Sequence, residues 1–130
     1  MEQQSSLSGG KLFPIFVYGT LKSGEVNAEM IPGVEREVVE TAPGYYLART
    51  GSFFPGLGEG GEETVKGELV QVTEERLRRL DSYEGHPNFF QRKPITLSDG
   101  RVVEAYFYPP SHLRGLSKVK GGVWSARKAG

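Results

Sequence analysis

The chain has 130 residues, 37% of them hydrophobic and 11% aromatic, which allows one core of ordinary size and excludes two independent domains. It contains no cysteine and two histidines, which excludes a disulfide framework, a thiolate-bound metal and a cysteine nucleophile, and leaves little room for a zinc site. The formal net charge is zero, and no apolar run approaches the roughly 20 residues that cross a bilayer, so we expect a soluble, cytoplasmic protein with no membrane partner.

The first elements in the chain are a polar arm and a strand. Residues 1–11 are rich in glycine and serine, which predicts a flexible N-terminal arm, and they lack the pattern of a signal peptide. The segment 13–18, FPIFVY, is aromatic and β-branched and predicts a buried strand. Further strands are predicted at 35–49 (with a break at 43–44), 67–72, 89–97 and 101–109, the last two joined by a hairpin turn at 98–100.

The predicted first strand runs directly into Tyr18, Gly19, Thr20 and Leu21. A glycine here allows a sharp turn and leaves backbone N–H groups uncovered, where a ligand carboxylate or a developing oxyanion can bind. Alternatively, this is an ordinary exit from a strand, in which Gly19 supplies its φ angle and Thr20 forms a local hydrogen bond. A P-loop is excluded because its glycine spacing and its Gly-Lys-Ser/Thr ending are missing.

Residues 51–61 are rich in glycine and carry Phe53 and Phe54. Such a segment is typical either of a mobile loop that closes over a ligand or of a surface hairpin.

One segment, 73–85, carries strong helical signals. Thr73 can cap its start and Gly85 can close its end. Several strands with one clear helix predict an α+β domain over residues 12–110, built as a closed or nearly closed barrel.

The predicted helix gives Glu84 an unusual position. Leu77, Leu80 and Glu84 stand at i, i+3 and i+7, so the carboxylate lies on the apolar side of the helix. Burial and the negative end of the helix both disfavour a charged carboxylate, so the pKa of Glu84 is expected to rise toward the range that suits proton transfer. Alternatively, the helix ends a residue or two earlier and Glu84 faces water.

The last predicted strands carry Arg92 and Tyr106. Arg92 is expected to pair with a structural acid such as Asp81 or Glu104, rather than with a substrate carboxylate. Tyr106 and Tyr108 share one face of their strand, which indicates core or pocket lining, and the Tyr106 hydroxyl is a candidate to bind a ligand.

The C-terminal stretch 111–130 holds five basic residues and no acid. A nucleic-acid reader pairs such charge with a recognisable motif, and none is present, so no nucleic-acid partner is expected. We predict a basic, solvated tail, part of which is pinned to the body by apolar side chains that include Val119 and Trp124.

Three stretches occur in an informative order: FVYGTLKSGEVN at 16–27, LDSYEGHPNFFQRKPITL at 80–97 and VEAYFY at 103–108. Together they resemble the γ-glutamylcyclotransferase-like superfamily, in particular its γ-glutamylamine cyclotransferase and AIG2-like branch. The resemblance implies a small mixed β-barrel with flanking helices, in which the YGTL loop faces the glutamate. It implies that the catalytic acid/base is Glu84 and that the γ-glutamyl group is bound by Tyr18, Gly19, Thr20 and Leu21.

The activity that this resemblance implies is conversion of a small γ-glutamyl amine or γ-glutamyl amino acid to 5-oxoproline and free amine, without cofactor or metal. It does not select the leaving-group amine, and the sequence leaves the oligomeric state open. The alternative is a non-enzymatic binding module of the same fold, in which Glu84 receives a ligand ammonium. A hydrolase is less favoured because no Ser/His or metal constellation supports it.

Overall fold

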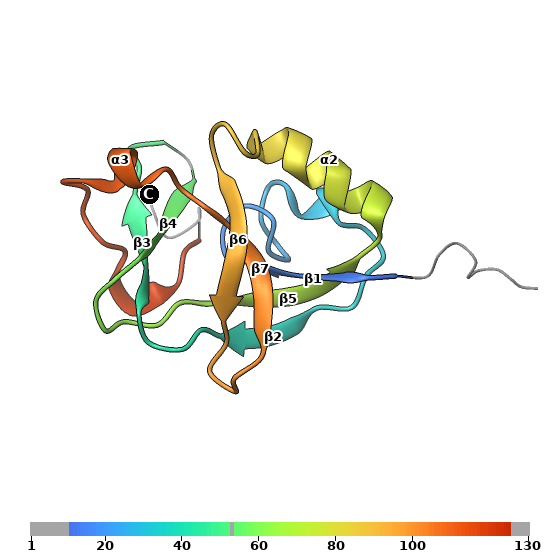
Figure 1. Ribbon diagram of the computed structural model, residues 1–130, viewed down its shortest axis with the longest axis horizontal. Coiled ribbons are helices and arrows are strands. Elements are labelled where there is room, and N and C mark those ends of the chain that lie inside the picture. Colours follow the sequence, from blue (N-terminus) through green and yellow to red (C-terminus); the bar gives the residue numbers. More distant parts are fainter. Residues whose placement is uncertain (1–10, 53, 126–130) are drawn as a thin grey trace, which may run out of the picture.

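The computed structural model describes residues 11–52 and 54–125 (Figure 1). Its elements are, in chain order, β1 (Phe13–Val17), the 3-10 helix η1 (Ala28–Met30), β2 (Glu37–Glu40), β3 (Tyr45–Arg49), β4 (Pro55–Glu59), β5 (Lys66–Val72), α2 (Glu74–Glu84), β6 (Gln91–Thr96), β7 (Val102–Phe107), α3 (Pro110–Leu113) and the 3-10 helix η2 (Lys120–Gly122). Residues 1–10 of the predicted arm lie outside the described residues.

Strand β1 is at the centre of a five-stranded sheet with the order β2-β5-β1-β7-β6. It pairs antiparallel with β5 and parallel with β7, so the sheet is mixed and the α+β prediction is confirmed. Side chains alternate along the strand: Ile15 and Val17 are buried in one apolar cluster, and Phe16 in another. Helix α2 covers the first cluster with Leu77 and Leu80, and Figure 1 shows it lying across β1 and β5.

The predicted barrel is not confirmed. The two edges of the sheet meet at one end, where an isolated bridge joins Thr41, just after β2, to Leu97, just after β6. Two backbone hydrogen bonds flank the bridge, from Ala42 to Thr96 at 2.9 Å and from Ser98 to Glu40 at 2.8 Å. The sheet therefore curls until its edges touch at that end, and the described strands show no closure along their full length.

The glycine-rich segment 51–61 contains a strand that sequence analysis missed. Residues Pro55–Glu59 form β4, which pairs antiparallel with β3, so this part of the segment is a hairpin. A Cβ atom added at Gly56 would lie 2.7 Å from the ring of Tyr108, and one at Gly58 would lie 2.6 Å from the ring of Tyr46. The glycines therefore allow two aromatic rings to pack directly on the strand backbone. Phe53 lies outside the described residues.

The C-terminal segment packs against the body as far as residue 125. Backbone hydrogen bonds of 2.8 Å run from Arg49 to Ser117 and from Val119 to Leu47, so this segment extends the β3 side of the hairpin. The side chains of Val119 and Trp124 are buried in the core, with 5% and 7% of their surface exposed. No helix among the described residues is long and apolar enough to span a membrane.

The packing of the C-terminal segment predicts a clear difference between two neighbouring substitutions. Trp124→Ala should lower the free energy of unfolding by about 3–5 kcal/mol, because it leaves a large cavity in the core. Val123→Ala is the matched control: this side chain is 41% exposed, and the change should cost less than about 1 kcal/mol. Urea unfolding followed by circular dichroism measures both, and equal losses would contradict the packing described.

Candidate active site

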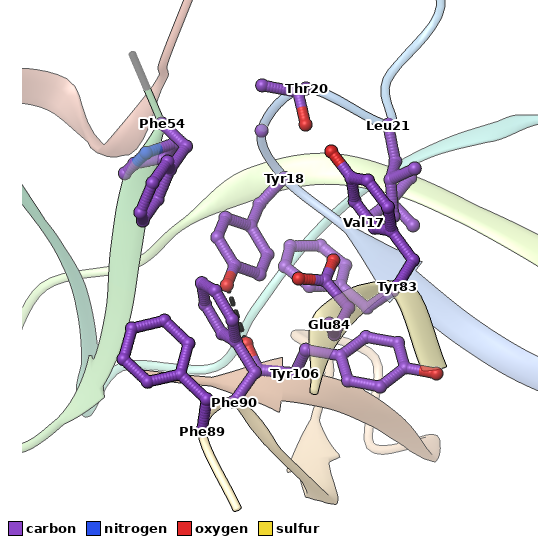
Figure 2. A pocket seen from close by; sticks show the side chains of 13 residues that line it. Val17, Tyr18, Thr20, Leu21, Phe54, Tyr83, Glu84, Phe89, Phe90 and Tyr106 are labelled. Atoms are coloured by element: carbon purple, nitrogen blue, oxygen red, sulfur yellow. Dashed lines mark hydrogen bonds between the residues drawn. The ribbon is translucent and has the colours of Figure 1, made fainter. Parts of the chain in front are cut away.

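The residues singled out from the sequence line one cavity of about 260 Å³ (Figure 2). They are Tyr18, Gly19, Thr20, Leu21, Glu84 and Tyr106. They come from the loop after β1, from the end of α2 and from β7, and the fold brings this loop next to Glu84, more than sixty residues further along the chain. The volume is just below the range of about 300–1,000 Å³ for drug-sized ligands, which suits a small metabolite.

Helix α2 carries Glu84 to the cavity as its last residue. Thr73 caps the start by accepting a hydrogen bond from the Arg76 backbone N–H at 3.2 Å, and Gly85 closes the end in the left-handed region with φ 74°. The helix therefore does not end before Glu84, which removes the alternative of an early helix end. Because Leu80 is buried one turn earlier, the same helix face brings Glu84 inward.

The carboxylate of Glu84 is half-buried in an apolar setting, and burial raises its pKa to about 7. No cation or hydrogen-bond donor pairs with this carboxylate among the residues that the structure describes. Its charge also contributes to the raised pKa of the buried Tyr18 hydroxyl, after the larger effect of burial. At neutral pH such a carboxyl group can both accept and return a proton.

The loop after β1 is a compact turn whose first amides point to no acceptor in the described structure. The carbonyl of Gly19 accepts from the Lys22 N–H at 3.0 Å, and that of Thr20 accepts from the Asn27 N–H at 2.9 Å. The Asn27 side chain donates to the hydroxyl groups of Thr20 and Tyr83. Within residues 11–52 and 54–125, no hydrogen-bond acceptor is found for the N–H groups of residues 19–21. These groups are therefore available to oxygen atoms of a ligand.

Gly19 is required for close contact and not for an unusual backbone angle. It is absent from the glycines with positive φ, so the φ explanation considered from the sequence is wrong. A Cβ atom at this position would lie 2.9 Å from Cδ of Pro55, the first residue of β4. The loop and the hairpin thus close one wall of the cavity by direct contact.

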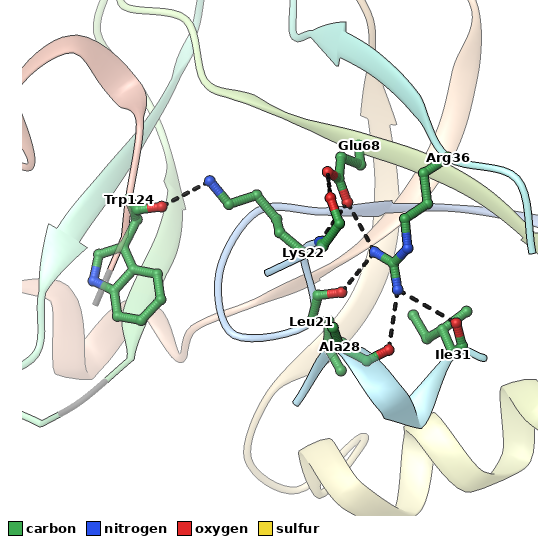
Figure 3. Close-up of polar contacts among 8 residues, drawn as sticks. Leu21, Lys22, Ala28, Ile31, Arg36, Glu68 and Trp124 are labelled. Carbon is green, nitrogen blue, oxygen red and sulfur yellow. Dashed lines mark hydrogen bonds and ion pairs between the residues drawn. The ribbon is translucent and has the colours of Figure 1, made fainter. Parts of the chain in front are cut away.

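Arg36 holds the loop from behind (Figure 3). Its guanidinium donates to the backbone carbonyl groups of Leu21 at 2.8 Å, Ala28 at 3.1 Å and Ile31 at 3.3 Å. It also forms a 2.8 Å ion pair with Glu68 on β5, whose carboxylate accepts from the backbone and side chain of Ser23. Sequence analysis missed this support, because nothing local to Arg36 indicates that a loop packs on it.

Tyr106 lines the cavity with its ring, but its hydroxyl is directed to Asp81, to which it donates at 2.6 Å. Arg92 binds both oxygens of the same carboxylate, at 2.9 and 3.0 Å, and contacts Glu104 at 2.6 Å. The predicted structural pairing of Arg92 is confirmed. The Tyr106 backbone carbonyl accepts from the Tyr18 hydroxyl at 2.5 Å, which orients Tyr18 across the cavity.

Sequence analysis named Phe54 in a segment that can close over a ligand, but it missed Tyr83, Phe89 and Phe90 in the aromatic wall of the cavity. Phe54, Phe89 and Phe90 line it, with Tyr83 at the rim. The pair at 89–90 lies five and six residues after Glu84, inside one of the recognised stretches, and this proximity was an available signal. No cluster of three or more His, Asp or Glu side chains is placed to hold a metal ion in the described part of the chain.

Comparison with known proteins points to one family. The profile of the gamma-glutamyl cyclotransferase, AIG2-like family matches residues 15–126. A Vibrio cholerae protein provisionally named a gamma-glutamylcyclotransferase is 36% identical over 114 residues, 87% of this chain and 96% of the relative. The gamma-glutamylaminecyclotransferase of Bos taurus is 36% identical over 98 residues, 65% of this chain and 56% of the bovine protein.

Solved structures share the fold. An AIG2-like protein from Mus musculus has a TM-score of 0.71 at 27% identity, covering 88% of this chain and 89% of the mouse chain. A uropathogenic E. coli-specific protein has a TM-score of 0.76 at 21% identity, covering 92% of this chain and 97% of that chain, which supports the fold alone. With a family profile that spans most of its length, the chain belongs to the gamma-glutamyl cyclotransferase, AIG2-like family.

Proposed function

We propose that this protein is a γ-glutamyl cyclotransferase that converts a γ-glutamyl amide into 5-oxoproline and a free amine. One observation carries the proposal: a half-buried, unpaired carboxylate, Glu84, shares a small cavity with a loop, residues 19–21, whose amide groups have no acceptor in the described structure. Membership of the family and the names of the relatives support this activity.

Glu84 would be the acid/base of the reaction. A γ-glutamyl compound carries its own nucleophile, because its α-amine can close a five-membered ring on the γ-carbonyl carbon. Glu84 takes a proton from the α-ammonium group, and the amine attacks the carbonyl carbon to form the new C–N bond. Glu84 then returns a proton to the leaving nitrogen as the old C–N bond breaks, and the extra proton of the new ring nitrogen passes through water to the released amine, which leaves as an ammonium ion. One carboxyl group with a pKa near 7 serves both steps.

The loop would bind oxygen atoms of the substrate. The N–H groups of residues 19–21 are in position to donate to the substrate α-carboxylate or to the oxyanion of the tetrahedral intermediate. Tyr18 would form the floor beside them, since its hydroxyl is fixed by the carbonyl of Tyr106. Arg36 then acts as a positioning residue, because it contacts the loop and not the cavity.

The first test is the loss of the proposed acid/base. Glu84→Gln keeps the shape of the side chain but removes proton transfer, so it should lower kcat for 5-oxoproline formation by about 100-fold or more. The matched control is Glu75→Gln, the same change on the same helix, where the side chain is 74% exposed. A panel of γ-glutamyl amides, assayed for 5-oxoproline by mass spectrometry, provides the measurement.

The outcomes of that test are distinct. Full activity of Glu84→Gln would remove Glu84 from the mechanism. Saturable binding of γ-glutamyl amides without any turnover by the wild type would show that the protein is a binding module and not an enzyme. Release of free glutamate would identify a hydrolase.

A pH profile tests the raised pKa. The carboxylate must be deprotonated to accept a proton, so kcat/KM should rise about tenfold per unit below pH 7 and level off above it. A profile already level at pH 5.5 would mean that Glu84 keeps the ordinary pKa of a solvated carboxyl group. Initial rates between pH 5.5 and 8.5 cover the inflection.

The contribution of Glu84 to the free energy of unfolding should fall as pH rises, whereas kcat/KM rises. Between the ordinary pKa of 4.5 and the folded value of about 7, the folded chain binds more protons at Glu84 than the unfolded chain, so this residue lowers stability as pH rises. Glu84→Gln should therefore be more stable than wild type at pH 8, by about 1–3 kcal/mol, and the gap should close toward pH 4.5. Urea unfolding at both pH values measures it. A gap that does not change with pH would contradict the burial of the charge.

A further inference from the structure

We propose that the preferred leaving group is an apolar, and best an aromatic, amine that carries no carboxylate. This inference rests on the proposed function and specifies its substrate class. Glu84 and the loop bind the glutamyl half of the substrate, and the rest of the cavity wall remains for the departing amine. The inference follows from the chemistry of that remaining wall.

That wall is built from aromatic rings that pack against one another at tilted or edge-to-face angles. The ring centroids of Phe54 and Phe90 are 5.9 Å apart, and those of Phe89 and Phe90 are 5.3 Å apart with an interplanar angle of 88°. Tyr108 supports all three from behind, at 5.4–6.1 Å. A cluster held by so many mutual contacts is a fixed surface, and its exposed edges favour another aromatic or aliphatic group.

The two halves of the substrate need different surroundings. In Figure 2 the Glu84 carboxylate lies between the loop residues Thr20 and Leu21 and the rings of Phe89 and Phe90. The glutamyl half carries an ammonium and a carboxylate, which fit Glu84 and the free loop amides. The amine that leaves is then directed toward the rings. Phe89 still exposes 37% of its surface at the mouth, so a leaving group would bury apolar area that the free protein leaves in water.

The described lining of the cavity offers no cationic side chain to a second carboxylate. Among the described residues that line the cavity there is no Lys, Arg or His, and Glu84 is itself an acid. A γ-glutamyl amino acid would place its second carboxylate against these rings, near the negative charge of Glu84 and without a cation among the described lining residues. Burying a charge without a partner is costly, so such substrates should be disfavoured relative to the same amine without the acid.

Four substrates separate these effects. N5-phenethylglutamine and γ-glutamylphenylalanine differ only in the carboxylate, and N5-ethylglutamine lacks the ring. γ-Glutamyl-ε-lysine has a leaving group with both an ammonium and a carboxylate. We expect kcat/KM for the phenethyl substrate to exceed each of the other three by about tenfold or more. A value for γ-glutamylphenylalanine or γ-glutamyl-ε-lysine that equals or exceeds it would overturn the inference and leave the proposed function intact.

A variant pair locates the preference on the wall. Phe89→Ala should shrink the ratio of kcat/KM between the phenethyl and ethyl substrates to about threefold or less, because it removes the exposed ring at the mouth. Val102→Ala is the matched control, since this apolar side chain is 63% exposed on β7 and does not line the cavity. An unchanged ratio in Phe89→Ala would place the preference elsewhere and overturn the assignment to this wall.

Binding to the Glu84→Gln protein separates failure of the inference from failure of the proposed function. Calorimetry with the same four compounds should give the phenethyl compound the highest affinity. If the wild type forms no 5-oxoproline from any of them, the proposed function fails, and this ranking alone decides the ligand class. Equal affinities for the phenethyl compound and for γ-glutamylphenylalanine would overturn the class.

Discussion

Strand β1 has no face turned to water, and the position of the cavity follows from that constraint. Ile15 and Val17 are buried on one side, and Phe16 and Tyr18 on the other, while β5 and β7 occupy both of its edges. A strand enclosed in this way can offer a ligand only its end. The backbone that follows is irregular, and its carbonyl groups need partners. Arg36 supplies donors to three of them and so fixes the shape of the loop, whose leading amides find no acceptor among the described residues.

Two arginines with carboxylate partners support opposite parts of the site. Arg36 with Glu68 holds the loop, and Arg92 with Asp81 holds the hydroxyl of Tyr106. Partly buried ion pairs contribute little net stability, because desolvation offsets their attraction. Their value here is geometric: a planar guanidinium fixes several acceptors at once. Glu84, the charged residue of the cavity, has no partner among the described residues, while the charges of Arg36 and Arg92 are matched by carboxylates.

The helix that carries Glu84 could be predicted from residues that are neighbours in the sequence. The caps of helix α2 are encoded within a few residues, so the direction of Glu84 could be read from spacing alone. Strand β4 could not be read in this way, because glycines at 56 and 58 are typical of loops. The reason for them is packing against the rings of Tyr46 on the paired strand and of Tyr108, which is far away in the sequence. The same reason hid the support from Arg36, whereas the apolar residues Val119 and Trp124 were enough to predict that part of the C-terminal segment packs on the body.

The contact between the C-terminal segment and the loop has a practical consequence. The chain contains one tryptophan, and its indole is buried in the core while its carbonyl accepts a 2.7 Å hydrogen bond from the ammonium group of Lys22 (Figure 3). Lys22 directly follows the loop that lines the cavity. The native sequence thus provides a single tryptophan that is hydrogen-bonded beside the site, so its emission is a natural signal to monitor during ligand titration without any label.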